Sequence, residues 1–201
     1  MATFLIGVDE AGRGPLAGPV AVGLVIVPAF MSIPETFPGV ADSKVLLPEK
    51  REEIFSILEK YAEYGIVRYQ VEFASARVID ERGITYAVRR CIYKGIQTLA
   101  PDAEGHMVLL DGLLRAPKQY EQRTIIGGDA SEPVISLASI AAKVKRDRLM
   151  QRLGKQYPGY GFEQHKGYAT QMHYSAIKKL GLCDIHRRTY GLERIEKVAL
   201  K

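Results

Sequence analysis

The chain has few of the features that mark secreted, membrane-spanning or zinc-binding proteins. Its two cysteines, Cys91 and Cys183, have neither metal-ligand spacing nor a partner motif, and the histidines lack the spacing of a zinc triad. No apolar run approaches the ~20 residues needed to cross a bilayer. The N-terminus, Met1-Ala2-Thr3, lacks the basic start of a secretory signal. We therefore expect reduced thiols, a cytoplasmic protein and no membrane partner.

Length and composition describe one ordinary globular domain. The chain has 201 residues, of which 47% are hydrophobic and 25% are charged. We predict a single domain over residues 1–201, acting as a monomer. The net charge of +5 favours a polyanionic partner, although many basic proteins bind no nucleic acid. The distribution of the charge is more informative than its sum, because basic residues cluster within residues 143–155 and 178–188.

The most distinctive stretch is residues 7–19, GVDEAGRGPLAGP, where an apolar run ends in two carboxylates and a glycine-rich turn. A second apolar run begins just beyond it, so the pattern predicts strand, corner, strand. Neighbouring strand side chains point to opposite faces. Asp9 and Glu10 would share a site only if the backbone left strand geometry at about Glu10, which the following glycines permit. The alternative is a polar strand end that runs into a surface hairpin.

Periodicity along the rest of the chain predicts an α/β fold. Alternating or continuous apolar runs predict strands at residues 65–72, 107–110 and 123–126. Helical periodicity predicts helices that begin near Pro48 and span residues 74–83, 84–99, 136–156 and 170–181. Strands first, then alternating helices and strands, indicate a central mixed β-sheet flanked by α-helices, with a helical C-terminal part.

Four acidic residues stand where predicted elements end: Asp9, Glu10, Asp111 and Asp129. Taken singly, each has a structural explanation; Asp111-Gly112 is a common hairpin pair, and Asp129 suits a turn or a helix start. Together at one sheet edge they would repel one another unless cations offset their charge. Oxygen ligands of this kind suit Mg²⁺ or Mn²⁺, and two such ions can clamp a phosphodiester.

Residues 7–19 closely resemble the first signature of the ribonuclease HII family. Further blocks of the chain resemble that family in the same order, at residues 42–44, 138–148, 165–170 and 186–188. The resemblance covers nearly the whole chain and implies the ribonuclease H-like fold. It departs from the family at Ala41, where asparagine is common, and at Ser131-Glu132-Pro133, where many members have a lysine. Residues 113–122 match nothing in it.

The resemblance implies an endonuclease that cuts RNA in RNA–DNA hybrids and at single ribonucleotides embedded in duplex DNA. The cut would lie 5′ of the ribonucleotide and leave a 3′-hydroxyl and a 5′-phosphate. The four acids would be catalytic and would hold Mg²⁺ or Mn²⁺, two ions during catalysis. The implied substrate contacts are Gly12, Arg13, Gly14, Lys44, Lys143, Lys166, Tyr168 and Arg187.

Two rival readings stay open on the sequence. Ribonuclease HIII belongs to the same superfamily, and the lack of an extra domain before Asp9 argues against it. A nucleic-acid-binding protein without catalysis is a different class, and the full carboxylate set argues against that. At single positions, Tyr168 has an alternative role as a loop anchor, and Asp147 is expected to be a local charge partner among basic neighbours. The preferred metal and any clamp or polymerase partner are not indicated.

Overall fold

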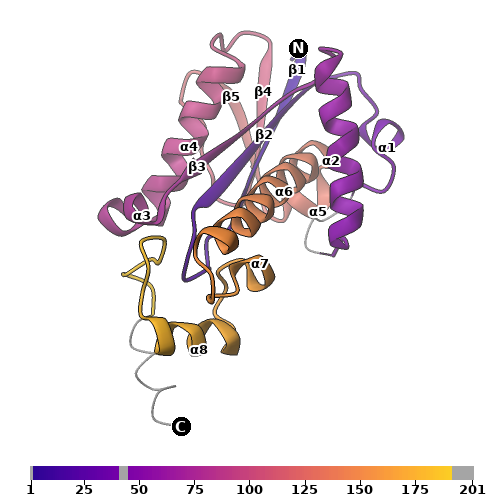
Figure 1. Cartoon of the computed structure of the whole chain (residues 1–201). Coiled ribbons are helices and arrows are strands. Elements are labelled where there is room, and N and C mark those ends of the chain that lie inside the picture. The colour runs from indigo at the N-terminus through magenta and orange to yellow at the C-terminus, as the bar shows by residue number, and fades with distance from the viewer. Residues whose placement is uncertain (1, 41–44, 192–201) are drawn as a thin grey trace.

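The computed structural model describes residues 2–40 and 45–191 and contains one mixed five-stranded sheet (Figure 1). Its strands lie in the order β3-β2-β1-β4-β5. Both β1–β2 and β2–β3 are antiparallel, whereas β4 runs parallel to β1 and to β5. The strands are β1 Phe4–Ala11, β2 Val20–Pro28, β3 Arg68–Ala74, β4 His106–Asp111 and β5 Glu121–Ile125.

Helices cover both faces of the sheet, which confirms the predicted α/β class. Helix α4 packs on one face, and α6, with α2 beside it, packs on the other. The described helices are α1 Ile33–Thr36, α2 Pro48–Glu63, α3 Ala76–Arg82, α4 Ile84–Leu99, α5 Gly128–Ser131, α6 Pro133–Gln156, α7 Phe162–His165 and α8 Gln171–Leu180. The sequence predicts a helix over residues 136–156. The corresponding helix, α6, begins three residues earlier, at Pro133, because proline is tolerated in a first helical turn.

The two faces of β1 follow the alternation expected of a strand. Ile6 and Val8 lie in the core beneath α4, whereas Leu5 packs in the core beneath α6. Strand β2 is buried over nearly its whole length because both of its faces are covered. The apolar run of residues 20–27 therefore forms a central strand.

Helix α6 approaches the sheet through two glycines. A Cβ at Gly7 would lie 2.1 Å from the carbonyl oxygen of Val134, and one at Gly23 would lie 2.1 Å from that of Ala138. Any side chain at either position would push the helix away. Gly23 is the register partner of Asp9, so this close contact occurs beside the first acidic residue.

The backbone does not leave strand geometry at about Glu10, which was the condition under which Asp9 and Glu10 would share a site. Strand β1 continues to Ala11, with Asp9 opposite Gly23 and Glu10 opposite Val22. The corner begins one residue later, at Gly12, where φ is +88°. Pairing with β4 ends at Val8, but pairing with β2 continues through both acids and keeps them in strand geometry, so the two neighbouring side chains point to opposite faces of the sheet.

The C-terminal helical part is fastened to this corner. The Leu16 N–H donates to the Gly167 carbonyl at 2.8 Å, and the Gly18 N–H donates to the Ile185 carbonyl at 2.8 Å. Segments far apart in the sequence thus meet beyond the end of the sheet, where α7 and α8 lie (Figure 1). No helix in the described part of the chain is long and apolar enough to cross a membrane.

Candidate functional site

The parallel pairing of β1 and β4 brings two of the predicted acids together. Val8 is the last β1 residue paired with β4, opposite Leu110, so the next residues, Asp9 and Asp111, lie beside each other at the same edge of the sheet. The carboxyl ends of parallel strands are the usual place for a ligand site in α/β proteins. The sequence placed both residues at strand ends, and the strand order makes them neighbours.

Asp9 is buried and unfavourably placed for a negative charge. Its side chain lies beneath α6, and the residue is only 4% exposed. The pKa of Asp9 is raised to about 8, chiefly by burial; the negative charges of Glu10 and Asp111 contribute to the rise, and a hydrogen bond with Ser139 opposes it. A cation bound here would favour the ionised carboxylate, because it supplies the opposite charge that the protein interior lacks.

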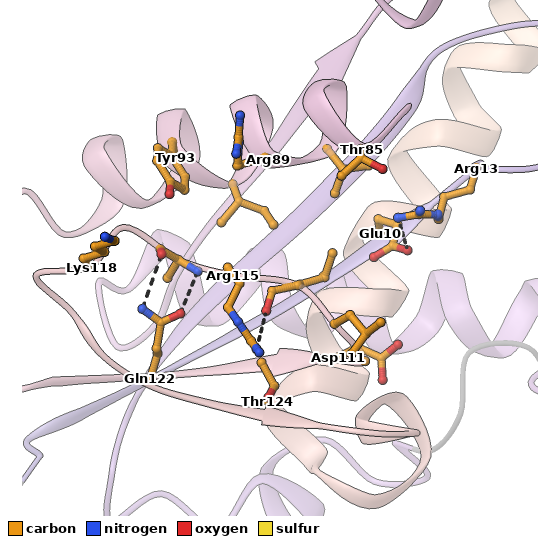
Figure 2. Close-up of a pocket in the computed structure, with 16 residues that line it drawn as sticks. Glu10, Arg13, Thr85, Arg89, Tyr93, Asp111, Arg115, Lys118, Gln122 and Thr124 are labelled. Carbon is orange, nitrogen blue, oxygen red and sulfur yellow. Dashed lines mark hydrogen bonds and ion pairs between the residues drawn. The ribbon is translucent and has the colours of Figure 1, made fainter. Parts of the chain in front are cut away.

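Glu10 faces the other side of β1, toward a cleft that it lines with Arg13 (Figure 2). Arg13 Nη1 lies 3.3 Å from Glu10 Oε1, and the Arg13 side chain is 45% exposed. Such exposed pairs contribute only about 0–1 kcal/mol. Arg13 can therefore exchange Glu10 for another anion at little cost.

The other two acids are organised by the turn after β5. The Gly128 N–H donates to Asp111 Oδ1 at 2.8 Å, which ties this turn to the end of β4. Asp129 lies in the first turn of α5 and is 4% exposed. Ser136 Oγ donates to the Asp129 carbonyl at 2.6 Å and joins the turn to α6.

All four acids therefore lie at or near one end of the sheet, but they do not converge on one point. Within residues 2–40 and 45–191, no group of three or more His, Cys, Asp or Glu side chains has the arrangement to hold a metal ion. The donor chemistry nevertheless fits Mg²⁺ or Mn²⁺, since every candidate ligand is a carboxylate oxygen.

The glycine corner is the turn of residues 12–19 between β1 and β2, and Arg187 supports it from inside the protein. Its guanidinium donates to three corner carbonyls: Nε to Gly18 at 3.0 Å, Nη1 to Arg13 at 2.6 Å and Nη2 to Gly12 at 2.6 Å. The residue is 1% exposed. Arg187 is therefore not placed to be the substrate contact that the resemblance implies, because its guanidinium is buried and donates to the corner carbonyls. Corner carbonyls have no strand partners, and a fork of N–H donors satisfies them.

Arg146 supports the same corner from α6 and was missed in the sequence. It is fully buried, and its Nε donates to the Pro19 carbonyl at 2.9 Å while Nη2 donates to the Lys166 carbonyl at 3.1 Å. One signal was available. Arg146 lies four residues after Ala142 and four before Met150, on the buried face of the helix.

The two glycines that flank Arg13 differ in what the fold requires of them. A Cβ at Gly12 would lie 2.0 Å from Arg146 Nε, and its positive φ disfavours any side chain. A Cβ at Gly14 would meet nothing within 4 Å, and its φ is outside the left-handed region. Packing within the chain explains Gly12. It gives no reason for glycine at position 14, which faces open space.

Tyr168 lies beside this corner on the loop that precedes α8. It is 42% exposed, and Lys143 Nζ and Arg146 Cζ each lie 5.8 Å from the centre of its ring. The His173 ring hydrogen-bonds with the Tyr168 carbonyl at 2.9 Å through Nδ1. The loop backbone is thus held, while the tyrosine ring is presented toward solvent.

The predicted lysines have different surroundings. Lys143 forms an ion pair with Asp147 at 3.0 Å, which confirms the local role expected for Asp147. Lys166 has a φ of 52°, and its ammonium donates to the Glu163 carbonyl. Burial lowers the pKa of Lys166. Lys44 lies outside the described residues.

Comparison with known proteins identifies the family. The family model for ribonuclease HII matches residues 6–192. The chain belongs to the ribonuclease HII family. The ribonuclease HII of Endomicrobium trichonymphae is 43% identical over 186 residues, which is 92% of this chain and 84% of that protein. The ribonuclease HII of Geobacillus kaustophilus is 42% identical over 187 residues, 93% of this chain and 68% of that protein.

Solved structures agree with the ribonuclease HII assignment. The ribonuclease H2 of Pyrococcus horikoshii OT3 has a TM-score of 0.76 and 27% identity, and the match covers 98% of this chain and 99% of that one. A ribonuclease HIII solved in complex with Mn²⁺ shares the fold, with a TM-score of 0.71 and 19% identity. The chain therefore has the ribonuclease H-like fold and is a nuclease, a hydrolase that acts on RNA–DNA hybrids.

The buried carboxyl of Asp9 predicts an unusual dependence of stability on pH. Below about pH 4 both folded and unfolded states hold the Asp9 proton, and above about pH 8 both release it. Between these limits only the folded state holds it, so its contribution to the free energy of unfolding falls as pH rises. Asp9→Asn removes this cost. We expect the variant to gain stability over the wild type by up to about 1.4 kcal/mol per pH unit in that window.

The measurement is urea unfolding from pH 5 to pH 8 with a chelator present. The exposed Asp102→Asn is the control for the loss of one negative charge. If the free energies of unfolding of Asp9→Asn and wild type differ by the same amount at every pH in this range, the burial argument is contradicted.

Proposed function

We propose that the chain cleaves the phosphodiester on the 5′ side of a ribonucleotide, in RNA–DNA hybrids and at single ribonucleotides in duplex DNA. The products would be a 3′-hydroxyl and a 5′-phosphate. One observation carries the proposal: buried Asp9 lies beside Asp111 at one edge of the sheet, and the glycine corner begins three residues after Asp9. The edge proposed to bind cations therefore adjoins the glycine corner, where a sugar could approach the backbone.

Asp9, Glu10, Asp111 and Asp129 would hold Mg²⁺ or Mn²⁺, with two ions present during catalysis. When bound, such ions supply an activated water and stabilise the leaving 3′-oxygen. The support is the all-carboxylate donor set and the cost of ionising Asp9 without a cation. The Gly128 N–H orients Asp111, and Ser139 orients Asp9 through the hydrogen bonds described above.

The corner and Tyr168 would select RNA over DNA. A site that hydrolyses phosphodiesters has no intrinsic reason to spare DNA, so selectivity requires contacts to the 2′-hydroxyl. Open space at Gly14 lets a sugar approach the backbone, and exposed Arg13 is placed to pair with a phosphate. Tyr168 offers a ring to the neighbouring deoxyribose, and Lys143 and Lys166 would contact phosphates.

One chain would supply the whole site. We propose that residues 1–201 act as a single-domain monomer, because one sheet with its covering helices carries all of the proposed groups that the structure describes. Cys91 and Cys183 are both free thiols, which suits a reducing compartment such as the cytoplasm.

Asp9→Asn should lower the cleavage rate by on the order of a thousandfold while substrate binding is largely kept. The assay compares an RNA–DNA hybrid, a duplex with one ribonucleotide and an all-DNA duplex, each with and without Mg²⁺. Asp102→Asn serves as the control and should cleave normally. Near wild-type cleavage by Asp9→Asn would overturn the site, and binding without cleavage by the wild type would indicate a non-catalytic protein.

Gly14→Ala should leave stability unchanged but reduce cleavage, because its methyl group would occupy the space that we assign to the sugar. Gly12→Ala should instead lower the free energy of unfolding by about 1–3 kcal/mol through its clash with Arg146. Chemical unfolding and single-turnover cleavage of both variants separate these effects. Full activity of Gly14→Ala would remove the corner from substrate recognition.

Tyr168→Ala should cost more activity on a duplex with one ribonucleotide than on a long hybrid, which offers many registers without a junction. We expect a loss of roughly tenfold or more on the first substrate. Tyr168→Phe keeps the ring and should lie between. Equal losses on both substrates, accompanied by reduced thermal stability, would make Tyr168 a loop anchor.

A further inference from the structure

A cleft of about 970 Å³ leads away from the carboxylate edge (Figure 2). It begins at Glu10 and Asp111 and runs between α4 and the segment that joins β4 to β5. Thr85, Arg89 and Tyr93 line it from α4, and Lys118 lines it from the facing segment. Apart from Glu10, Arg13 and Asp111 at its inner end, no residue that lines the cleft has a role in the site proposed above.

The chemistry of the cleft changes along its length. Acidic side chains line only the end at Glu10 and Asp111, whereas the rest is edged by cations. Among the described residues, no ion pair ties Arg89, Arg115 or Lys118 to an acid. The floor is apolar and is formed by Val88, Ile92, Leu114 and Ala116. Unpaired cations above an apolar floor suit a ligand that carries both negative charge and flat apolar surface.

The wall opposite α4 is held in place by its own hydrogen bonds. Gln122 Oε1 accepts from the Ala116 N–H at 2.9 Å, and Gln122 Nε2 donates to the Ala116 carbonyl at 3.3 Å. The hydroxyl of buried Tyr120 donates to the Ala100 carbonyl. Residues 113–122 are the stretch that the sequence did not match to the family. In the structure they form a fixed wall.

We infer that this cleft binds one strand of the nucleic-acid substrate as that strand leaves the carboxylate edge. The inference rests on the proposed function, because it extends that site. Arg89, Arg115 and Lys118 would contact successive phosphates, and Tyr93, which is 36% exposed, would stack on a base. From Thr85 to Tyr93 the helix rises about 12 Å, enough for three or four nucleotides at about 3.4 Å each.

The test removes two cleft cations and compares them with two cations elsewhere. The cleft variant, Arg89→Ala/Lys118→Ala, removes two positive charges that line the cleft. The control variant, Arg68→Ala/Arg90→Ala, removes equal charge at exposed positions outside the cleft. Binding is measured against salt concentration without divalent ions. The substrates are duplexes with one central ribonucleotide and flanks trimmed stepwise on the 5′ side or the 3′ side. Inorganic phosphate and mononucleotides are tested as competitors.

On full-length duplex the cleft variant should bind roughly three- to tenfold more weakly at low salt, with a log–log salt slope reduced by about one unit per lost contact. The difference in affinity between the cleft variant and the wild type should vanish when one of the two flanks is trimmed. The flank that has this effect is the one that binds in the cleft. The control variant should not show this dependence on flank length.

Three results would overturn the inference. These are unchanged binding by the cleft variant, an equal and flank-independent loss in both variants, and competition by mononucleotides with no effect of flank length. Wild-type cleavage distinguishes the two levels of proposal. If the wild type cuts ribonucleotide substrates while the cleft variant binds them normally, only the inference about the cleft is wrong. If the wild type cuts none of them, the proposed function fails.

Discussion

Contact between the backbone of α6 and the glycines of β1 and β2 sets the position of the carboxylate edge. Gly7 and Gly23 let the helix backbone lie against the sheet, where any side chain would clash with a carbonyl. This approach places Ser139 within hydrogen-bonding reach of Asp9 and removes Asp9 from water. The raised pKa of that carboxyl is therefore a consequence of how closely one helix packs on two strands.

A second constraint is the polar interior behind the glycine corner. Arg146 and Arg187 are buried, and burial lowers the pKa of Arg187 to about 10, with the charge of Arg146 contributing. Burying two cations is costly unless their donors are satisfied. Here the carbonyls of Gly12, Gly18 and Pro19 accept from them, although Arg146 Nη1 has no hydrogen-bond partner among the described residues. The corner, α6 and the segment after α8 therefore depend on one hydrogen-bond network.

The same network reaches the loop that carries Tyr168. The Lys166 carbonyl accepts from Arg146, and the Gly167 carbonyl accepts from the corner backbone at Leu16. Beneath the loop, burial lowers the pKa of His173 to about 4, so its ring is neutral near pH 7. The two parts proposed to read the sugar are thus held relative to each other, although about 150 positions separate them in the sequence.

The sequence by itself determined the fold class, the family and the strand ends that carry Asp9 and Asp111, because apolar periodicity and local motifs are short-range properties. It did not determine that Glu10 remains in a strand and points away from Asp9, since pairing of β1 with β2 beyond Val8 decides that. It also made Arg187 a surface contact, because charge in a sequence does not reveal burial. Only the tertiary structure turned residues 113–122 into the wall of a cationic cleft, since that wall exists through contacts with distant residues.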